Sequence, residues 1–419
     1  MIPYKIAIAF VVYCFLDLHT VSDMARADDS HISPYSLPEI LTLAHKHSPV
    51  MTGVAAALEE SQGRQIAAGA YLNPTVTGAA GRGSIRDPRT GVSIAERTIT
   101  VEQPLEWPGK RSARQRAADA GFSGALAAIE EAKVTVTAEV KAGFYQLLFA
   151  QQDAQLAKEN LRTVEDFVTL IRARVETKES PKFELVKATV ELQKADKDLA
   201  RAENALLVAR ANLNKIAGKA LGERFAIHGE FEAPKADPDL RFLTEQAMAR
   251  HPALRRQEKA VEQARFSLEH ERAARIPNVS VIGQYHREAG DESIVAGLSV
   301  PVPLWYRRQG EIGTAVGTHH RAQAERLRIQ YELEQAVTQY FQEMQTARRQ
   351  IQVFERGLLY QAKEALDIAQ FSFRNGVASL LEVIDAQRVY RQTLLESTQA
   401  RAAYSLALAR LEQAVGGLP

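Results

Sequence analysis

Apolar residues recur every seven positions along several long stretches of the chain, with large and small side chains in separate rows. Between residues 182 and 217 the large row is Leu185, Leu192, Leu199, Leu206 and Leu213, and the companion row is the small residues Ala188, Ala195, Ala202 and Ala209, followed by Ile216. A second stretch contains Val337, Met344, Ile351, Leu358 and Ala365. Sustained heptads indicate helices that pack in left-handed pairs. The chain is therefore expected to be mainly α-helical, with long coiled-coil hairpins and a smaller β part.

The heptads and the positions of proline predict where the helices lie. We expect helices over residues 38–70, 109–175, 181–217, 241–275, 308–374 and 379–415. No proline interrupts 109–180 or 304–418, and at 1.5 Å per residue a helix from about residue 110 to 175 is roughly 100 Å long. Helices in globular proteins average about 11 residues, so a helix of this length is not typical of a globular domain.

A sharp turn separates the two members of each predicted hairpin. The turns are Glu176–Pro181 in the first half and Arg374–Ser379 in the second. Gly376 can adopt the left-handed conformation that ends a helix, and Pro181 suits a first helical turn. Lys178 stands at the position that corresponds to Gly376, so the two turns are expected to differ in conformation.

Four shorter segments alternate between apolar and polar residues, as β-strands do. They span 75–83, 95–103, 278–287 and 293–300, and each has about the 9 to 11 residues that cross a bilayer as a tilted strand. Aromatic residues, which collect at membrane surfaces, follow the second and fourth strands. These are Trp107, Trp305 and Tyr306. Two soluble hairpins with aromatic residues in the core are the alternative.

The chain contains an internal repeat. Matching pairs keep their order at nearly constant separation, namely Pro49 and Pro252, Pro74 and Pro277 (203 positions), Pro104 and Pro301 (197), and Glu184 and Glu382, Gly218 and Gly416 (198). We therefore expect a first repeat over 28–220, a linker over 221–240 and a second repeat over 241–419.

The first residues have the pattern of an export signal. Lys5 precedes an apolar run over residues 6–16, and Ala25 and Ala27 supply the small residues that a signal peptidase accepts. Residues 1–27 are therefore predicted to be a signal peptide, with an uncleaved core helix as the alternative. No later segment has about 18 consecutive apolar residues, so entry into a membrane would require strands.

Composition excludes several classes of function. The 52 Lys and Arg against 51 Asp and Glu leave a formal charge of +1, which argues against a nucleic-acid partner. The single cysteine, Cys14, excludes a disulfide framework and a multi-thiolate metal site. Neither the pair His45 and His47 nor the pair His319 and His320 has a spacing that places both rings on one helix face. With no recognisable catalytic motif, we expect no enzyme, no cofactor and no resident metal.

Four strands cannot close a barrel, and an open edge in lipid leaves backbone polar groups without partners. Closure requires further copies of the chain. Two copies supply eight strands, whose interior is filled by side chains, and three supply twelve, which leave room for a lumen.

Two local segments carry a resemblance to a known family. They are VEQPLEWPGKR at 101–111, and FRNG at 373–376 followed by LLEVIDAQ at 380–387. The sequence resembles the TolC-type outer-membrane factors, in particular their CzcC-like heavy-metal efflux branch, over residues 36–417. The resemblance implies a homotrimer with a 12-stranded barrel in outer-membrane lipid and a helical tunnel in the periplasm. The linker 221–240 would lie in the equatorial region of this tunnel, which docks onto a periplasmic adaptor (membrane fusion) protein and an inner-membrane efflux pump.

The same resemblance points to site residues. Glu382 and Asp385 correspond to carboxylates that narrow the periplasmic entrance, and Phe373 to a residue that helps to hold it shut. A three-fold axis would gather six carboxylates, which attract cations. Glu382 also completes a capping box with Ser379, which is a structural alternative for its role. The tip turns and adaptor contact are expected at Gly376, Ser379, Lys178 and Pro181, and the junction of barrel and tunnel at Pro74, Pro104, Trp107, Pro277, Pro301 and Trp305.

The sequence thus predicts the outer-membrane exit duct of a tripartite efflux system of the resistance-nodulation-division type, for divalent heavy-metal cations. One alternative keeps the duct and changes its cargo to drugs or a protein secreted by a type I system. A second alternative is a periplasmic coiled-coil interaction protein.

Overall fold

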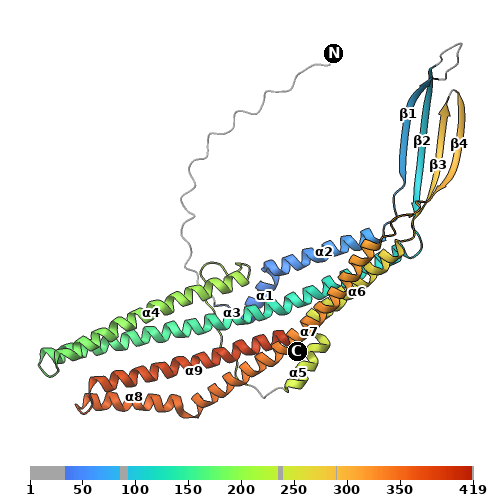
Figure 1. Cartoon of the computed structure of the whole chain (residues 1–419). Coiled ribbons are helices and arrows are strands. Elements are labelled where there is room, and N and C mark those ends of the chain that lie inside the picture. The colour runs from blue at the N-terminus through green and yellow to red at the C-terminus, as the bar shows by residue number, and fades with distance from the viewer. Residues whose placement is uncertain (1–33, 85–92, 235–238, 289, 418–419) are drawn as a thin grey trace, which may run out of the picture.

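The computed structural model describes residues 34–84, 93–234, 239–288 and 290–417. It is an elongated molecule, in which a bundle of long helices leads at one end into a four-stranded sheet (Figure 1). The predicted signal peptide, 1–27, lies outside the described residues. None of the helices in the described part of the chain is long and apolar enough to span a bilayer.

The elements of the second half follow the same order as those of the first. The first half contains α1 (Leu37–His47), α2 (Pro49–Gly69), β1 (Thr75–Ser84), β2 (Ser93–Leu105), α3 (Lys110–Glu176) and α4 (Lys182–Ile216). The second contains α5 (Leu240–Arg250), α6 (Pro252–Ala273), β3 (Val279–Glu288), β4 (Asp291–Ser299), α7 (Gln309–Val353), α8 (Leu359–Arg374) and α9 (Leu380–Val415). The prediction of a mainly helical chain with four strands is confirmed.

The helices predicted over 38–70 and 241–275 are each divided in two, because a proline disfavours helical geometry at the residue before it. Ser48 and His251 accordingly have extended backbone, with ψ of 130° and 126°. Each also caps the helix that follows. The Ser48 hydroxyl accepts a hydrogen bond from the Val50 amide, and the His251 Nδ1 accepts one from the Ala253 amide.

The helix predicted over 308–374 is interrupted by a π-helical segment, Phe354–Leu358, between α7 and α8. Gly357 within it has a φ of 132°, which a residue without a Cβ adopts at little cost. A π-bulge with such a glycine is a recognised cause of a helix kink. The first half has no such break, since α3 runs without interruption for 67 residues.

The strands form one antiparallel sheet in the order β1-β2-β3-β4. The central pair joins the two halves of the chain, with Glu96 opposite Glu288 and Pro104 opposite Ser280. The strand bounds differ from the predicted ones by one or two residues at several ends, and β2 extends to Leu105. Strands β1 and β4 form the two edges of this sheet.

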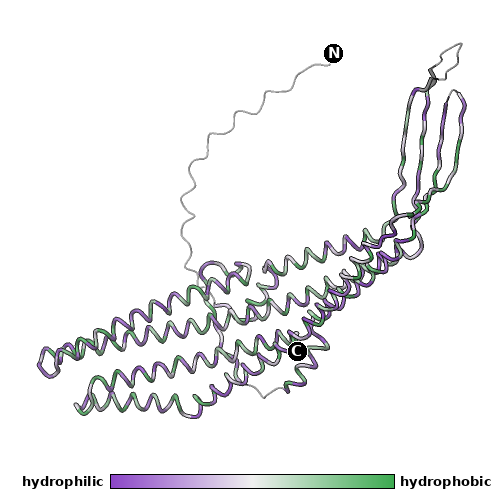
Figure 2. Tube along the Cα trace, in the orientation of Figure 1, coloured by the Kyte–Doolittle hydropathy of each residue, from purple (hydrophilic) through white to green (hydrophobic). Residues whose placement is uncertain are grey.

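The apolar rows of the sequence form buried seams between helices. The small residues Ala188, Ala195 and Ala202 of α4 are all buried. Figure 2 shows hydrophobic and hydrophilic residues alternating along the helices, as expected for helices that bury one face each. One cluster surrounds Phe144 and includes Leu221 and Phe225 of the segment after α4, a second surrounds Met344, and a third lies near the hairpin turns.

His251 makes the stability of this fold depend on pH. Burial lowers the pKa of its imidazole, although the carbonyl of Gln413 and the carboxylate of Glu131 oppose this. The unfolded chain, with a histidine pKa of about 6.5, therefore takes up a proton first, and stability is lost as pH falls through that value toward the lower folded pKa.

We expect His251→Ser, which places at this cap the residue type that caps α2, to remove this pH dependence. Thermal unfolding of the purified protein in detergent, recorded between about pH 5 and pH 8 around the histidine range, measures the effect. Parallel pH profiles for wild type and variant would contradict the assignment.

Candidate functional site

The two hairpin turns lie at the same end of the molecule, opposite the sheet (Figure 1). The prediction that they differ in conformation is wrong. Lys178 and Gly376 have left-handed φ values of 64° and 74°. The amide of Glu179 donates to the Arg174 carbonyl at 2.8 Å, and the amide of Val377 donates to the Ser372 carbonyl at 2.9 Å. Both helices thus end with the same hydrogen-bonded motif. The hydrogen bonds that it provides to the last carbonyls of the helix outweigh the conformational strain of a lysine with positive φ.

The two carboxylates predicted for the entrance lie on the exposed first turns of α9. Glu382 accepts hydrogen bonds from the Ser379 hydroxyl at 2.9 Å and the Ser379 amide at 3.3 Å. The capping box that was its structural alternative is therefore present. Asp385 pairs with the exposed Arg388 at 2.5 Å. In the first half, Pro181 occupies the cap position before α4.

Phe373 is buried at the end of α8, with 4% of its surface exposed. It packs in the third cluster with Val168 and Ile171 of α3 and Leu380 and Val383 of α9. The guanidinium of Arg174 lies 4.7 Å from the centre of its ring. The aromatic side chain thus ties the two hairpins together near their turns.

An ion pair that the sequence did not predict also joins the two hairpins. Arg391 of α9 contacts Asp198 of α4 at 2.9 Å, and both side chains are mostly buried. The pair lines a groove that also contains Asp385 and Arg388. No local sequence pattern marks this pair, because Asp198 and Arg391 lie 193 positions apart in the chain.

The residues predicted for the junction all lie where the strands meet the helices. Pro74 and Pro277 lie shortly before β1 and β3, Pro301 lies shortly after β4, and Pro104 lies inside β2. Trp107 and Trp305 are 44% and 90% exposed.

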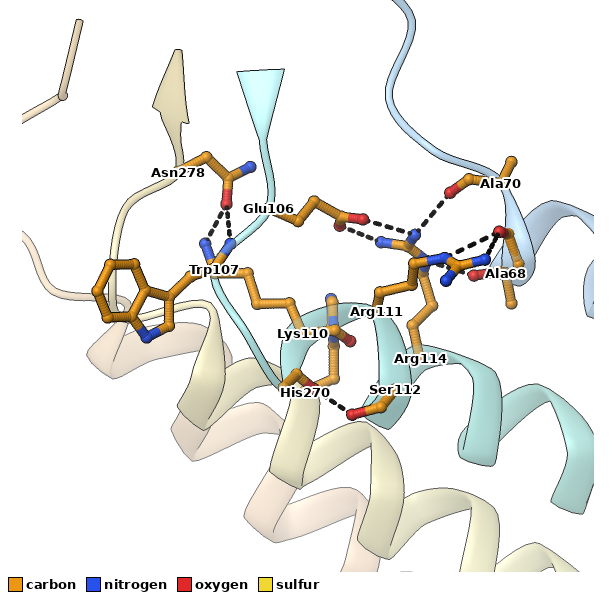
Figure 3. Close-up of polar contacts among 12 residues, drawn as sticks. Ala68, Ala70, Glu106, Trp107, Lys110, Arg111, Ser112, Arg114, His270 and Asn278 are labelled. Carbon is orange, nitrogen blue, oxygen red and sulfur yellow. Dashed lines mark hydrogen bonds and ion pairs between the residues drawn. The ribbon is translucent and has the colours of Figure 1, made fainter. Parts of the chain in front are cut away.

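A buried lysine whose role the sequence did not predict holds this junction together (Figure 3). Lys110 begins α3 and is 6% exposed. Its Nζ donates to Asn278 Oδ1 at 2.6 Å, and Asn278 Oδ1 also accepts from the backbone amide of Trp107 at 3.4 Å. Burial lowers the pKa of Lys110, which Glu106 partly offsets. The His270 Nδ1 donates to the Lys110 carbonyl, so α6 is anchored at the same point.

Two arginines of α3 satisfy the carbonyls at the end of α2. Arg111 donates to the Gly69 carbonyl, and Arg114 donates to the carbonyls of Ala68 and Ala70. Arg114 also pairs with Glu106 at 2.5 Å, and this hydrogen-bonded pair holds the pKa of Glu106 below its ordinary value. Basic side chains stabilise a helix C-terminus, where carbonyls lack partners. The motif LEWPGKR therefore performs a structural task that its sequence alone does not reveal.

The sheet presents two chemically different faces, because residues in register point to the same side and neighbours along a strand to opposite sides. One face is mainly polar and carries Thr75, Thr77, Glu96, Thr98, Thr100, Glu102, Gln284, His286, Glu288, Asp291 and Ser293, together with the apolar Ala79, Ile282 and Val295. The other carries Val76, Ile99, Val101, Val281, Tyr285, Ile294 and Leu298, with Arg82, Arg97, Arg287 and Glu292 toward the end far from the helices. Among the described side chains of the strands, the polar face has four carboxylates and neither lysine nor arginine.

We expect Arg114→Ala to destabilise the protein by about 2–3 kcal/mol. The change leaves two carbonyls at the end of α2 and the mostly buried carboxylate of Glu106 without their hydrogen-bond partner. The matched control is Arg116→Ala on the same helix, whose more exposed ion pair with Glu269 is worth about 0–1 kcal/mol. Urea unfolding of the two purified variants checks the difference. Equal losses would show that the junction network contributes no more than a surface pair.

Comparison with known proteins agrees with this architecture. The family profile described as Outer membrane efflux protein matches residues 40–219 and 243–417. The chain is 26% identical over 361 residues to the cobalt-zinc-cadmium resistance protein CzcC of Cupriavidus metallidurans, which covers 86% of this chain and 84% of that protein. It is 26% identical over 306 residues to the nickel and cobalt resistance protein CnrC of the same species, covering 72% and 70%.

A solved structure shares the fold. The CmeC outer membrane channel of Campylobacter jejuni superimposes with a TM-score of 0.79 at 16% identity, over 91% of this chain and 85% of that one. Channels of this kind lie in the outer membrane with a tunnel in the periplasm, form trimers, and work with adaptor proteins and inner-membrane pumps. The resemblance inferred from the sequence is thereby confirmed, and the chain belongs to the outer membrane efflux protein family, whose members are channels and not enzymes.

Proposed function

We propose that this protein is the trimeric exit duct of a tripartite efflux system that exports divalent heavy-metal cations. Family membership favours a channel over a periplasmic coiled-coil interaction protein. The metal cargo is supported by similarity to proteins whose names record resistance to cobalt, zinc, cadmium and nickel.

The separation of charge between the two faces of the sheet carries the proposal. The apolar face is suited to lipid, so the polar face with Glu96, Glu102, Glu288 and Asp291 would line the lumen. Rings of carboxylates raise the local concentration of cations and repel anions. His286 lies among them, with its Nε2 3.4 Å from Glu288 and its Nδ1 3.8 Å from Glu96.

The open edges of the sheet support trimerisation. Three copies of the four strands give twelve, enough to close a barrel with an open lumen. The proposal also includes the division of the chain into a signal peptide over 1–27, repeats over 28–220 and 241–419, and a linker over 221–240. The recurrence of element order and of the Ser48 and His251 caps supports the repeat.

The tip of the hairpins is proposed as the periplasmic entrance. Exposed Glu382 and Asp385 would face the three-fold axis, and buried Phe373 would hold the hairpins in register behind them. Gly376, Ser379, Lys178 and Pro181 would contact the adaptor, as they form the outermost turns.

A strain that lacks this protein is expected to grow poorly in zinc, cobalt or cadmium and normally on hydrophobic drugs. The wild-type gene should restore metal tolerance, and Asp385→Ala should alter it by removing part of the entrance charge. Glu396→Ala, an exposed carboxylate further along α9, is the matched control. Sensitivity to drugs with normal metal tolerance would contradict the metal cargo and leave the duct intact.

The reconstituted channel is expected to prefer cations. Under a salt gradient, Asp291→Asn should move the reversal potential toward zero, because it removes a lumen carboxylate from each of the three copies. Its neighbour Glu292 lies on the apolar face, so Glu292→Gln should leave the reversal potential unchanged. Equal shifts for the two variants would show that the assignment of the faces is wrong.

A further inference from the structure

Three arginines interrupt the apolar face of the sheet near the end that is far from the helices. They are Arg82 of β1, Arg97 of β2 and Arg287 of β3, and all three are exposed. Arg97 lies directly opposite Arg287 in the register, and Arg287 lies opposite Glu292 of β4. The next row toward the helices holds Ile99, Tyr285 and Ile294 and begins the apolar band.

The row formed by Arg97, Arg287 and Glu292, with Arg82 one row beyond it on the same face, carries more positive charge than neighbouring carboxylates balance. Arg287 contacts Glu292 at 3.4 Å, with both side chains about half exposed. Within the described ranges, Arg82 and Arg97 take part in no ion pair. Like charges directly opposite each other across a strand pair destabilise a sheet. The pairing of Arg97 with Arg287 therefore favours an anion between or beside the two guanidinium groups.

The level of the row matches a membrane surface. Arg97 lies eight residues from Leu105, where β2 ends at the junction, and eight residues span roughly 26 Å along a strand. At a strand tilt of about 40° this is a rise of about 20 Å along the membrane normal, within a lipid-facing band about 25 Å tall. The long arginine side chains can extend from there to the outer edge of the band. Because the helices extend into the periplasm from the junction, the arginines lie at the outer surface. Arginine is tolerated there, whereas it is costly near the bilayer midplane.

We propose that Arg97 and Arg287, supported by Arg82, bind the phosphate groups of the phosphorylated glycolipid in the outer leaflet. Guanidinium groups bind phosphate oxygens in a bidentate manner, and two in adjacent strands can share one phosphate. The occupant is a lipid because the row borders an exposed apolar band that acyl chains would cover. This surface is independent of the cargo, and it requires only that the strands cross the outer membrane.

Native mass spectrometry of the intact purified channel, mixed with lipid A, tests the proposal. We expect the wild type to retain bis-phosphorylated lipid A at least about tenfold better than the dephosphorylated lipid, which lacks the charge-assisted contacts. The double variant Arg97→Gln/Arg287→Gln should lose this preference, and Arg97→Lys/Arg287→Lys should keep part of it. Arg349→Gln, an exposed arginine of α7, is the matched control and should bind as wild type.

Equal retention of the two lipids by the wild type would overturn the proposal, and so would an unchanged preference in the glutamine double variant. The comparison of the two lipids uses only the wild-type channel, so it decides the matter even if the double variant fails to assemble. The growth and reversal-potential experiments can fail without affecting this result, because neither measures lipid.

Discussion

Backbone hydrogen bonding within lipid is the constraint on which this architecture depends. Strands β1 and β4 each leave one row of amide and carbonyl groups without a partner in the four-stranded sheet. In hydrocarbon each unpaired group costs several kcal/mol, since no water replaces the missing partner. In the proposed barrel a single chain would therefore have no stable place in the membrane, and its strands would acquire one only beside strands of other copies. Assembly and membrane insertion are consequences of the same requirement.

The helical part meets a related requirement with side chains. The junction must end α2, begin α3 and start two strands within a few residues, and each transition leaves backbone groups unpaired. Arg111 and Arg114 satisfy carbonyls of α2, and Asn278 accepts from the amide of Trp107 and from Lys110. The network is local in space, yet it joins segments from both halves of the chain. It fixes the direction in which the sheet leaves the bundle.

Periodicity predicted the elements well, because burial of one face imposes a repeat of seven on paired helices and of two on strands. Ala188, Ala195 and Ala202 of α4 are buried as that argument requires. The errors came from local backbone chemistry. Pro49 and Pro252 mark the repeat in the sequence, and each also imposes an extended backbone on the residue before it, Ser48 or His251. Gly357 lies within an apolar heptad that predicts a continuous helix. The conformation of Lys178 is set by the end of the helix and not by its residue type.

The candidate site was predictable only in part, because a single sequence reports neighbours along the chain and not across it. The capping box of Ser379 and Glu382 is local, and the sequence revealed it. Asp198 and Arg391 meet across two hairpins, and Lys110 meets Asn278 across the two halves. The faces of the sheet were visible as alternation. Their opposite charge became clear only when the register aligned Glu96 with Glu288 and Arg97 with Arg287.

The break at Gly357 gives the two hairpins different mechanical properties. The continuous α3 is a strut, which transmits an axial load from the tip to the junction without a weak point in its backbone. The corresponding pair of helices in the second half, α7 and α8, has a more flexible point at Phe354–Leu358, where regular α-helical geometry is interrupted. A force applied at the Gly376 turn therefore bends the helix at Phe354–Leu358, between α8 and α7. A force applied at the Lys178 turn is transmitted along α3 to the base of the sheet.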